Sequence, residues 1–357
     1  MGKIKLLFVL PTLNIGGAEK VTVNIINSLD VKIFDIHLIV IDNRYKNLET
    51  LINQNVNIKY LNIIKTRKAF LKLAKEILLL KPDIVFSSLN RTNILVLLIN
   101  IIYRSFKVII REPSMPSVQV RNGYMSSKMK FIIKLLYPFA ERVIAQTEYM
   151  KRDIEMAYKI DAKKVIVASN PIDKVYIQKS ICTEKNPFEE YRARINCVYV
   201  GRLSDEKNPL FLIEAFNKVI KEDKKFHLYI IGDGYLKEDV LITIKALRIE
   251  KNITMLGFKD NPYPYIKYAD MVLLCSKWEG MPNVVIESMF LNTPVVSTLS
   301  TLALSDLVVH GQTGYLVKKY NIDDFSKAVL DFDQLECKFT DFEMFDFNKF
   351  FTSIKNL

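Results

Sequence analysis

Short apolar segments alternate with longer segments of helical periodicity along the chain. In the first half, the apolar segments lie at residues 4–10, 36–41, 57–61, 83–87, 107–110, 142–145 and 165–168. Helical patterns fill the intervals, for example at residues 18–29 and 69–80, and the second pattern ends before Pro82, which cannot continue a helix. Strands that alternate with helices in this way are typical of a parallel sheet covered by helices on both faces. The first half therefore predicts one doubly wound α/β domain.

The same alternation begins again after an irregular, charged segment around Pro171 and Pro187. The later strands are expected at residues 196–201, 227–232, 253–256, 270–275 and 294–297, and the helices at 209–220, 236–247, 283–291 and 323–330. The sequence thus predicts two Rossmann-like doubly wound parallel-sheet domains. We expect them to face each other across a cleft at the carboxyl ends of their strands, where open parallel sheets bind ligands.

The pattern also predicts where the domains begin and end. The expected boundaries are residues 1–175 for the first domain, 176–194 for the connection, 195–335 for the second domain and 336–357 for a C-terminal helix. The tail 341–357 reads as an amphipathic helix with apolar residues at Phe342, Phe345, Phe347, Phe350, Phe351 and Ile354. Such a helix needs an apolar surface, and a return to the first domain would supply it.

Composition and charge limit the class of protein. The chain has 357 residues, of which 50% are hydrophobic and 25% charged, a globular composition at a length that favours two domains. The formal net charge is +12, with +15 up to residue 180 and −3 after it. This excess predicts an anionic partner for the first domain, either a nucleic acid or an acidic membrane surface. Nucleic acid is less favoured, because the basic residues are not interleaved with aromatic residues in any recognisable module.

Cysteine spacing and the lengths of the apolar segments exclude further classes. Cys182, Cys197, Cys275 and Cys337 form no C-x-x-C pair, so their spacing indicates neither a disulfide framework nor a zinc site. The longest apolar stretch, at residues 94–103, is shorter than the roughly 20 residues that a membrane-spanning helix needs. The run 6–10 is too short for the core of a signal peptide. We therefore expect a cytoplasmic protein that is soluble or lies on a membrane without crossing it.

The first candidate site follows the first predicted strand. Gly16-Gly17-Ala18-Glu19 stands where this strand gives way to a helix. Adjacent glycines let backbone N–H groups approach a ligand, and the start of a helix adds partial positive charge, which suits a phosphate or a sugar hydroxyl. Because the pair lacks the spaced glycines of dinucleotide-binding loops, a plain strand-to-helix turn is an equal alternative.

The second candidate site occupies the same topological place in the second predicted domain. Arg202 follows a strand that ends at Gly201, and Lys207 lies shortly before a helix that Pro209 marks. Two cations that point into a cleft can neutralise a diphosphate, the guanidinium through its planar fork and the ammonium as a point charge. The alternative is a solvated charged loop, which most loops of this composition form.

The third candidate site is the most specific. Glu279 and Glu287 are two acids with seven residues between them, and Asn283 is expected to cap a helix that carries Glu287 one turn inside. Glu279 then lies at the cleft, and Glu287 lies deeper, where a carboxylate can accept hydrogen bonds from two vicinal hydroxyls such as those of a ribose. The alternative is that Glu287 is a buried partner of a basic side chain, since a charge among apolar residues must be compensated.

Taken together, these motifs resemble the family 4 glycosyltransferases, retaining enzymes with the two-Rossmann-domain glycosyltransferase B architecture. The resemblance runs over nearly the whole chain. It rests on the order and spacing of Gly16-Gly17-Ala18-Glu19, Ser169-Asn170-Pro171-Ile172-Asp173, Gly201-Arg202-Leu203 with Glu206-Lys207, Ile231-Gly232-Asp233-Gly234, the Glu279 to Glu287 pair, and Gly311-Gln312-Thr313-Gly314-Tyr315.

The resemblance implies a nucleotide sugar, with UDP preferred, bound mainly by the second domain. Arg202 and Lys207 would hold the diphosphate and stabilise charge on the leaving nucleoside diphosphate. Glu279, with these two cations, would complete the catalytic set by contacting the donor sugar, and Glu287 would accept the ribose hydroxyls. Further donor contacts are implied at Gly16, Gly17, Phe258, Gly280, Met281, Asn283 and Val284. No cofactor or metal is expected, because the cations do the work of a metal ion.

The first domain departs from the pattern of the family. Many members place a histidine near the cleft, but His37, His227 and His310 do not end the relevant strands. Arg111 and Glu112 stand at one of these strand ends, and we expect them to contact the acceptor or the donor. If the acceptor hydroxyl attacks from the face that the departing phosphate leaves, a phosphate oxygen can act as the base and no protein base is required.

The basic charge of the first domain also has an interpretation. Lys128, Lys130 and Lys134 punctuate an apolar stretch that ends at Tyr137, a pattern typical of an interfacial helix drawn to anionic lipid. The acceptor would then be a saccharide or a lipid-linked saccharide, reached from the cytoplasmic face of a membrane on which the protein lies peripherally. The alternative is a core helix with a solvated lysine edge.

Two functions are open on the sequence alone. One is a retaining, metal-independent glycosyltransferase of polysaccharide or glycan biosynthesis. The other is a catalytically degenerate partner that keeps the fold and docks on a membrane or on an active transferase. The presence of Arg202, Lys207, Glu279 and Glu287 favours the enzyme, because a scaffold has no reason to keep two acids that are prone to burial facing two cations.

Overall fold

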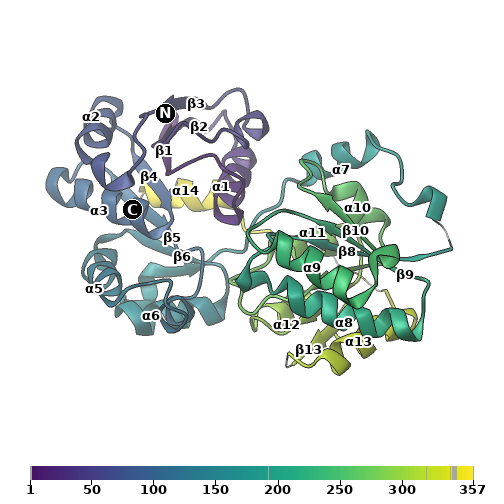
Figure 1. The fold of residues 1–357 in the computed structure, drawn as a ribbon. Coiled ribbons are helices and arrows are strands. Elements are labelled where there is room, and N and C mark those ends of the chain that lie inside the picture. The colour runs from purple at the N-terminus through teal and green to yellow at the C-terminus, as the bar shows by residue number, and fades with distance from the viewer. Residues whose placement is uncertain (1, 192, 319, 338, 340–343, 357) are drawn as a thin grey trace. The chain divides into compact units, whose positions relative to one another are not determined.

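A computed structural model describes residues 2–191, 193–318, 320–337, 339 and 344–356 of the chain. The chain forms two compact units (Figure 1). Unit 1 comprises Met1–Asp173 and Met344–Leu357, and unit 2 comprises Lys174–Glu343. Each unit is a parallel sheet with helices on both faces, so the expected α/β fold class is confirmed.

Unit 1 is built on a seven-stranded parallel sheet in the order β3-β2-β1-β4-β5-β6-β7. The strands are β1 Ile4–Leu10, β2 Phe34–Val40, β3 Asn57–Tyr60, β4 Ile84–Ser88, β5 Lys107–Arg111, β6 Arg142–Ala145 and β7 Val165–Val167. In the central strand β1, Leu6 pairs with Ile36 on one side and with Ile84 on the other. Strands buried on both faces read as continuous apolar runs, which is why the sequence pattern locates them closely.

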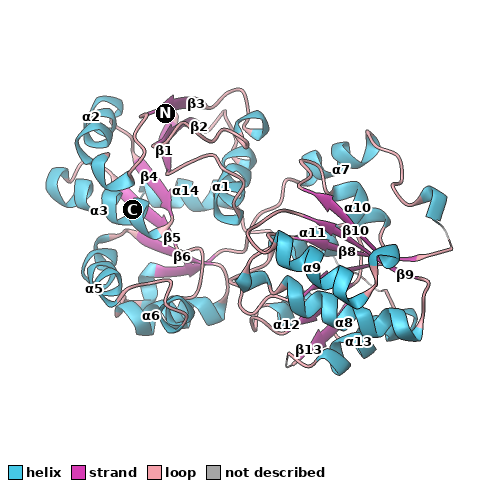
Figure 2. Ribbon diagram, viewed as in Figure 1, coloured by secondary structure: helices cyan, strands magenta, loops and turns pink. Residues whose placement is uncertain are grey.

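Helices cover both faces of this sheet (Figure 2). One face carries α2 Phe70–Leu80, α3 Asn90–Tyr103, α5 Ser127–Leu136 and α6 Glu148–Tyr158, with the short α4 Pro116–Arg121 beside them. The other face carries α1 Gly17–Ser28 and α14 Phe347–Asn356. Each layer buries its own cluster of apolar side chains against the sheet.

The C-terminal helix α14 belongs to unit 1, where the apolar tail finds the surface that it needs. Phe351 is fully buried, and its ring lies 6.0 Å from that of Phe8, 6.4 Å from that of Phe34 and 6.1 Å from that of Phe86. The Lys107 ammonium donates to the Ile354 carbonyl at 2.8 Å. The helix begins at Phe347 rather than at residue 341, and Phe342 lies outside the described residues.

Unit 2 is built on a six-stranded parallel sheet in the order β10-β9-β8-β11-β12-β13. The strands are β8 Ile195–Val200, β9 Phe226–Ile231, β10 Ile253–Gly257, β11 Met271–Leu274, β12 Val295–Thr298 and β13 Gly314–Val317. The helices are α7 Lys174–Cys182, α8 Pro209–Glu222, α9 Lys237–Leu247, α10 Tyr263–Tyr268, α11 Asn283–Phe290, α12 Leu304–Leu307 and α13 Ile322–Leu330.

Two elements of unit 2 differ from the sequence-based expectation. The segment 176–194, expected to be an irregular connection, contains most of α7, which buries Ile177 and places Tyr176 edge-on to Tyr263. Strand β13 is absent from the strands expected from the sequence, and it begins at Gly314 directly after a turn. A Cβ atom on Gly314 would lie 2.0 Å from the Val295 carbonyl oxygen, so the glycine permits a close strand approach in a segment that reads as a turn.

A buried polar network ties β5 to the helices of unit 1. The Tyr137 hydroxyl donates to the Glu112 carboxylate at 3.0 Å and accepts from the Asn93 amide at 3.0 Å. Both Glu112 and Tyr137 are fully buried. Burial raises the pKa of Glu112 to about 8, although the Tyr137 hydroxyl and the Arg111 charge act in the opposite direction. Folding therefore favours the protonated form of Glu112.

Replacing Phe351 should destabilise unit 1 strongly. Phe351→Ala removes a buried ring that packs against three phenylalanines of the sheet, which typically costs about 3–5 kcal/mol of the free energy of unfolding. Lys349→Ala, in the exposed face of the same helix, should change it by less than about 0.5 kcal/mol. Urea unfolding monitored by circular dichroism measures both changes. Equal effects of the two substitutions would contradict the packing of α14 described here.

The protonation of Glu112 should make stability depend on pH. The folded-state pKa lies above the ordinary value of 4.5, so between 4.5 and about 8 the folded protein holds a proton that the unfolded chain has released. The free energy of unfolding should therefore fall as pH rises through this range, by up to about 1.4 kcal/mol per pH unit. Glu112→Gln should lose this contribution, whereas Glu148→Gln, at an exposed position, should keep it. Urea unfolding across the range tests the prediction, which an identical pH slope for Glu112→Gln and the unmodified protein would refute.

Candidate functional site

The strand order of unit 2 identifies the place where a ligand is expected. Strands β9 and β10 follow β8 on one side of it in the sheet, and strands β11, β12 and β13 then follow on the other side. Open parallel sheets bind ligands beyond the carboxyl ends of the two strands between which the order reverses. In unit 2 these strands are β8 and β11. The predicted Arg202–Lys207 and Glu279 motifs follow β8 and β11, so they lie at this switch point.

The loop after β8 presents a guanidinium to solvent. The Arg202 side chain is 68% exposed, and its Nη2 atom lies 3.3 Å from an oxygen of Glu206. The Tyr199 hydroxyl donates to the Arg202 carbonyl at 2.9 Å and fixes the backbone of the loop. An exposed guanidinium whose backbone is held can turn from its surface partner Glu206 towards an anion.

A close approach of two loops depends on glycine. A Cβ atom on Gly232, whose φ is +145°, would lie 1.9 Å from the Gly201 carbonyl oxygen. A Cβ atom on Gly234 would lie 2.2 Å from the Leu203 carbonyl oxygen. These glycines therefore let the turn after β9 pack against the Arg202 loop, which is a structural role.

Lys207 and Glu279 meet at the switch point. The Lys207 ammonium donates to a Glu279 carboxylate oxygen, and the Ser276 hydroxyl donates to the same oxygen at 2.6 Å. The side chains of Lys207 and Glu279 are only 21% and 13% exposed, so water screens the pair weakly. This contact joins the loops that follow the two neighbouring strands β8 and β11.

Two further residues hold these loops together. The Cys275 thiol donates to the Lys207 carbonyl at 3.2 Å and to the Asn208 carbonyl at 3.3 Å. Burial raises the pKa of Cys275 to about 12, so the sulfur keeps the proton that it donates. The Tyr320 hydroxyl lies 2.9 Å from the Ser276 carbonyl oxygen and 2.5 Å from that of Lys277, and it donates to this pair.

The roles of Cys275 and Tyr320 could hardly be predicted from the sequence. Cys275 reads as the apolar end of a strand, and Tyr320 lies after β13, far along the chain from the turn that it contacts. Nearness of Cys275 to a charged loop was the only available hint, because a buried thiol usually packs as a small apolar group.

Glu287 lies on helix α11, as the sequence predicts, and its side chain is buried. The N-cap residue of this helix differs from the predicted Asn283. Pro282 occupies the N-cap position and Asn283 is the first helical residue. Proline has no side-chain oxygen, so it cannot accept hydrogen bonds from the amides of the first turn. The Tyr263 hydroxyl lies 3.5 Å from a Glu287 carboxylate oxygen. This burial keeps both interpretations open, a structural acid and a ribose-binding acid.

The remaining predicted donor contacts in unit 2 lie on two loops. Gly280, Met281 and Val284 are partly exposed around the start of α11. Phe258 is about half exposed and follows Gly257, whose φ of +66° turns the chain at the end of β10. Within the described residues, no hydrogen bond or ion pair joins Phe258 to Lys207 or Glu279.

In unit 1 the predicted sites lie at the ends of β1 and β5. Gly16, at the N-cap of α1, has a φ of −132°, which any residue adopts, so its backbone conformation does not require glycine. Arg111 and Glu112 are buried, and Arg111 donates to the Asn170 side chain. Desolvation lowers the pKa of Arg111 to about 10. Contact of Gly16, Gly17, Arg111 and Glu112 with a ligand stays a prediction.

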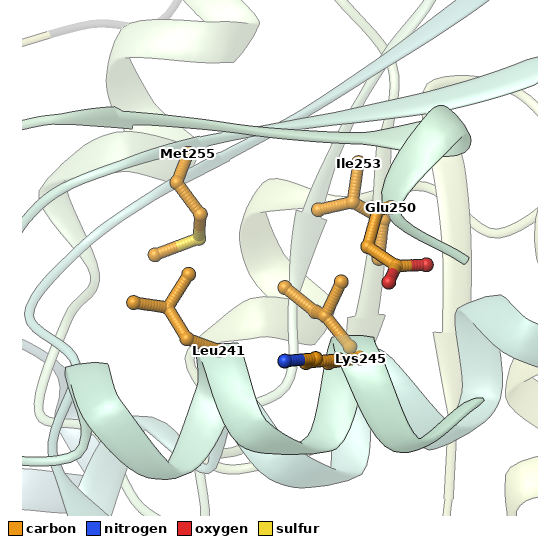
Figure 3. Close-up of a pocket in the computed structure, with 6 residues that line it drawn as sticks. Leu241, Lys245, Glu250, Ile253 and Met255 are labelled. Atoms are coloured by element: carbon orange, nitrogen blue, oxygen red, sulfur yellow. The ribbon is translucent and has the colours of Figure 1, made fainter. Parts of the chain in front are cut away.

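In the described part of the chain, no group of three His, Cys, Asp or Glu side chains could hold a metal ion. A cavity of about 410 Å³ lies between α9 and β10 (Figure 3). Its lining is mainly aliphatic, with Leu241 and Met255 projecting into it and Lys245 and Glu250 at its edge. None of the predicted site residues lines this cavity.

No helix in the described ranges is long and apolar enough to cross a membrane.

Comparisons with known proteins agree with the two-unit fold. The family described as Glycosyltransferase Family 4 matches residues 15–175, and the family described as Glycosyl transferases group 1 matches residues 183–339. A similar solved structure is that of Anabaena Alr3699/HepE in complex with UDP-glucose, with a TM-score of 0.75 and 18% identity over 93% of this chain and 91% of that one.

Two curated relatives come from Campylobacter jejuni. The chain is 30% identical to N-acetylgalactosamine-N,N'-diacetylbacillosaminyl-diphospho-undecaprenol 4-alpha-N-acetylgalactosaminyltransferase over 91% of this chain and 89% of that protein. It is 26% identical, over 96% and 95%, to GalNAc-alpha-(1->4)-GalNAc-alpha-(1->3)-diNAcBac-PP-undecaprenol alpha-1,4-N-acetyl-D-galactosaminyltransferase. The chain therefore belongs to the family 4 glycosyltransferases and is a glycosyltransferase with the glycosyltransferase B fold.

Proposed function

We propose that this protein transfers a sugar from a UDP-sugar to a lipid-linked saccharide in the biosynthesis of a surface polysaccharide or glycan. The observation that carries the proposal is the Lys207–Glu279 contact at the switch point of unit 2, beside the exposed Arg202 guanidinium. The names of relatives with undecaprenol-linked acceptors, and the UDP-glucose complex of a solved structure with the same fold, support the choice of substrates.

In this proposal Arg202 and Lys207 bind the donor diphosphate. The guanidinium is exposed and can meet one phosphate, while the ammonium is held in place by Glu279. Preorganised cations stabilise the charge that develops on a leaving group, because they need not reorient during the reaction. Glu279 contacts the hydroxyls of the donor sugar. Glu287 accepts hydrogen bonds from the ribose hydroxyls once the bound donor has displaced the groups that now bury the Glu287 carboxylate.

The proposed reaction retains the configuration of the donor sugar. The bond between the anomeric carbon and the donor phosphate oxygen breaks, and the acceptor hydroxyl oxygen bonds to that carbon from the same face. The hydroxyl proton passes to the departing phosphate oxygen, which keeps the electron pair of the broken bond. The residues then need only stabilise the nucleoside diphosphate, and Arg202 and Lys207 supply that charge without a metal ion.

We further propose that the protein works on the cytoplasmic face of an anionic membrane, bound to its surface. A lipid-linked acceptor keeps its hydrocarbon chain in the bilayer and presents only its saccharide to the enzyme. An enzyme that lies on the membrane meets such an acceptor by diffusion in two dimensions, and the excess positive charge of the first half of the chain favours this location.

Removing the Lys207 ammonium should weaken UDP binding. A charge-assisted hydrogen bond to phosphate contributes about 1.5–3 kcal/mol, so Lys207→Ala should raise the dissociation constant of UDP by roughly tenfold to a hundredfold. Lys218→Ala, which removes an exposed lysine of α8, should leave it unchanged. Isothermal titration calorimetry with UDP and GDP provides the measurement. Binding of neither nucleotide to the unmodified protein would overturn the proposed function.

Loss of the Tyr320 hydroxyl should slow transfer more than it weakens donor binding. Tyr320→Phe frees the Ser276–Lys277 turn that positions Glu279, but it leaves Lys207 in place. We expect kcat to fall by about tenfold and the UDP dissociation constant to change by less than about threefold, roughly 0.6 kcal/mol. Tyr268→Phe is the control at a half-exposed tyrosine of α10. Steady-state hydrolysis of the UDP-sugar, with calorimetry, measures both quantities, and a loss confined to UDP affinity would contradict the positioning role.

A further inference from the structure

Nearly all of the net charge of the protein comes from one stretch of unit 1. Residues 61–140 contain fourteen Lys and Arg and three Asp and Glu, a net charge of +11 out of +12 for the chain. This stretch includes α2, α3 and α5, which lie on the same face of the sheet (Figure 2). Helix α3 contacts α2 on one side and α5 on the other. Six of these fourteen cations lie on α2, α3 and α5, and Glu76 is the one acid of these three helices.

Helices α3 and α5 expose large apolar side chains on the side that faces away from the core. Their inner sides bury residues such as Ile99 and Ile133. Their outer sides form what we call the α3–α5 surface, defined by Leu98 and Ile102 of α3, Phe131 and Leu135 of α5, and Phe139 in the turn that follows. Ile102 and Phe131 are 61% and 62% exposed. The outer side of a helix at a protein surface is normally polar. Exposed apolar side chains in this position indicate a surface that binds a partner.

The cations of these helices are not neutralised by neighbouring acids. Helices α3 and α5 contain no Asp or Glu. Within the part of the chain that the structure describes, no ion pair involves Arg91 or Arg104 at the ends of α3. The same holds for Lys128 and Lys134 of α5. The α3–α5 surface thus combines apolar side chains with unneutralised positive charge.

The neighbouring helix α2 extends the same character. Leu71 and Leu79 are strongly exposed, and Lys72 and Lys75 lie beside them in the helix. The acid of this helix, Glu76, is paired with Lys59 of β3. The helical layer from α2 to α5 therefore presents exposed apolar and basic side chains without a free carboxylate of its own.

We infer that the α3–α5 surface, extended by α2, is the face by which the protein lies on an anionic bilayer. Apolar side chains enter the boundary between headgroups and acyl chains, and the lysines and arginines around them meet the lipid phosphates. Charge complementarity selects this partner, because a soluble protein with matching apolar and acidic groups would need a specific shape, whereas a bilayer needs only this composition. The choice of a bilayer rests on the proposed lipid-linked acceptor.

Sedimentation with lipid vesicles tests the inference on the full-length protein. The vesicles contain phosphatidylcholine either alone or mixed with phosphatidylglycerol. We expect binding to the anionic vesicles only, reduced at least about tenfold in Lys128→Gln/Lys130→Gln/Lys134→Gln and similarly in Phe131→Ser/Leu135→Ser. The matched control is Ile242→Ser, which removes an exposed apolar side chain of similar size from α9 in unit 2 and should bind vesicles as the unmodified protein does.

Other outcomes would overturn the inference. One is vesicle binding that neither set of substitutions changes, and another is equal binding to neutral and anionic vesicles. If Phe131→Ser/Leu135→Ser instead converts a dimer to a monomer in analytical ultracentrifugation, the surface joins two copies of the chain. Calorimetry with UDP in the absence of vesicles separates this test from that of the proposed function. The α3–α5 variants should bind UDP normally, and a protein that binds vesicles but not UDP would refute the donor site alone.

Discussion

The ion pair between Lys207 and Glu279 is the contact on which the proposed chemistry depends. It joins the loops after two neighbouring strands, and both side chains are mostly shielded from water. A shielded ammonium without a counter-charge would be costly, so an acid beside it allows the cation to be kept at the switch point in the absence of ligand. The same acid competes with any incoming phosphate for that cation. Glu279 therefore both positions the cation and limits how strongly it binds the diphosphate.

The surroundings of this pair are organised to hold its geometry. The thiol of Cys275 fixes the backbone of the lysine loop, and Ser276 and Tyr320 fix the turn before the glutamate. Each of these groups donates its hydrogen bond to a carbonyl or carboxylate oxygen of the protein. Because these donors are already used, they do not compete with the ammonium for a phosphate. Arg202 differs, because its side chain is largely exposed and has only the surface partner Glu206. The site thus combines one shielded cation with one exposed cation.

The strands and long helices could be predicted from the sequence, because strands buried on both faces are continuous apolar runs and the helices repeat with a different period. Strand β13 could not, since Gly314 at its start permits close packing and also marks turns. Lys207 and Glu279 were predicted from motif spacing, but their contact was not. The burial of Glu112 and Arg111 was also missed, because a charged pair at a strand end reads as exposed, and only the packing of Tyr137 and Asn93 around it shows otherwise.

A double-mutant cycle on UDP affinity tests the central claim most directly. Calorimetry would compare the unmodified protein with Lys207→Ala, Glu279→Gln and the double variant. If the carboxylate competes with the diphosphate for the ammonium, Glu279→Gln should tighten UDP binding in the presence of Lys207 and have no effect in its absence. An equal effect of Glu279→Gln in both backgrounds would show that the two side chains act independently, and it would contradict the account.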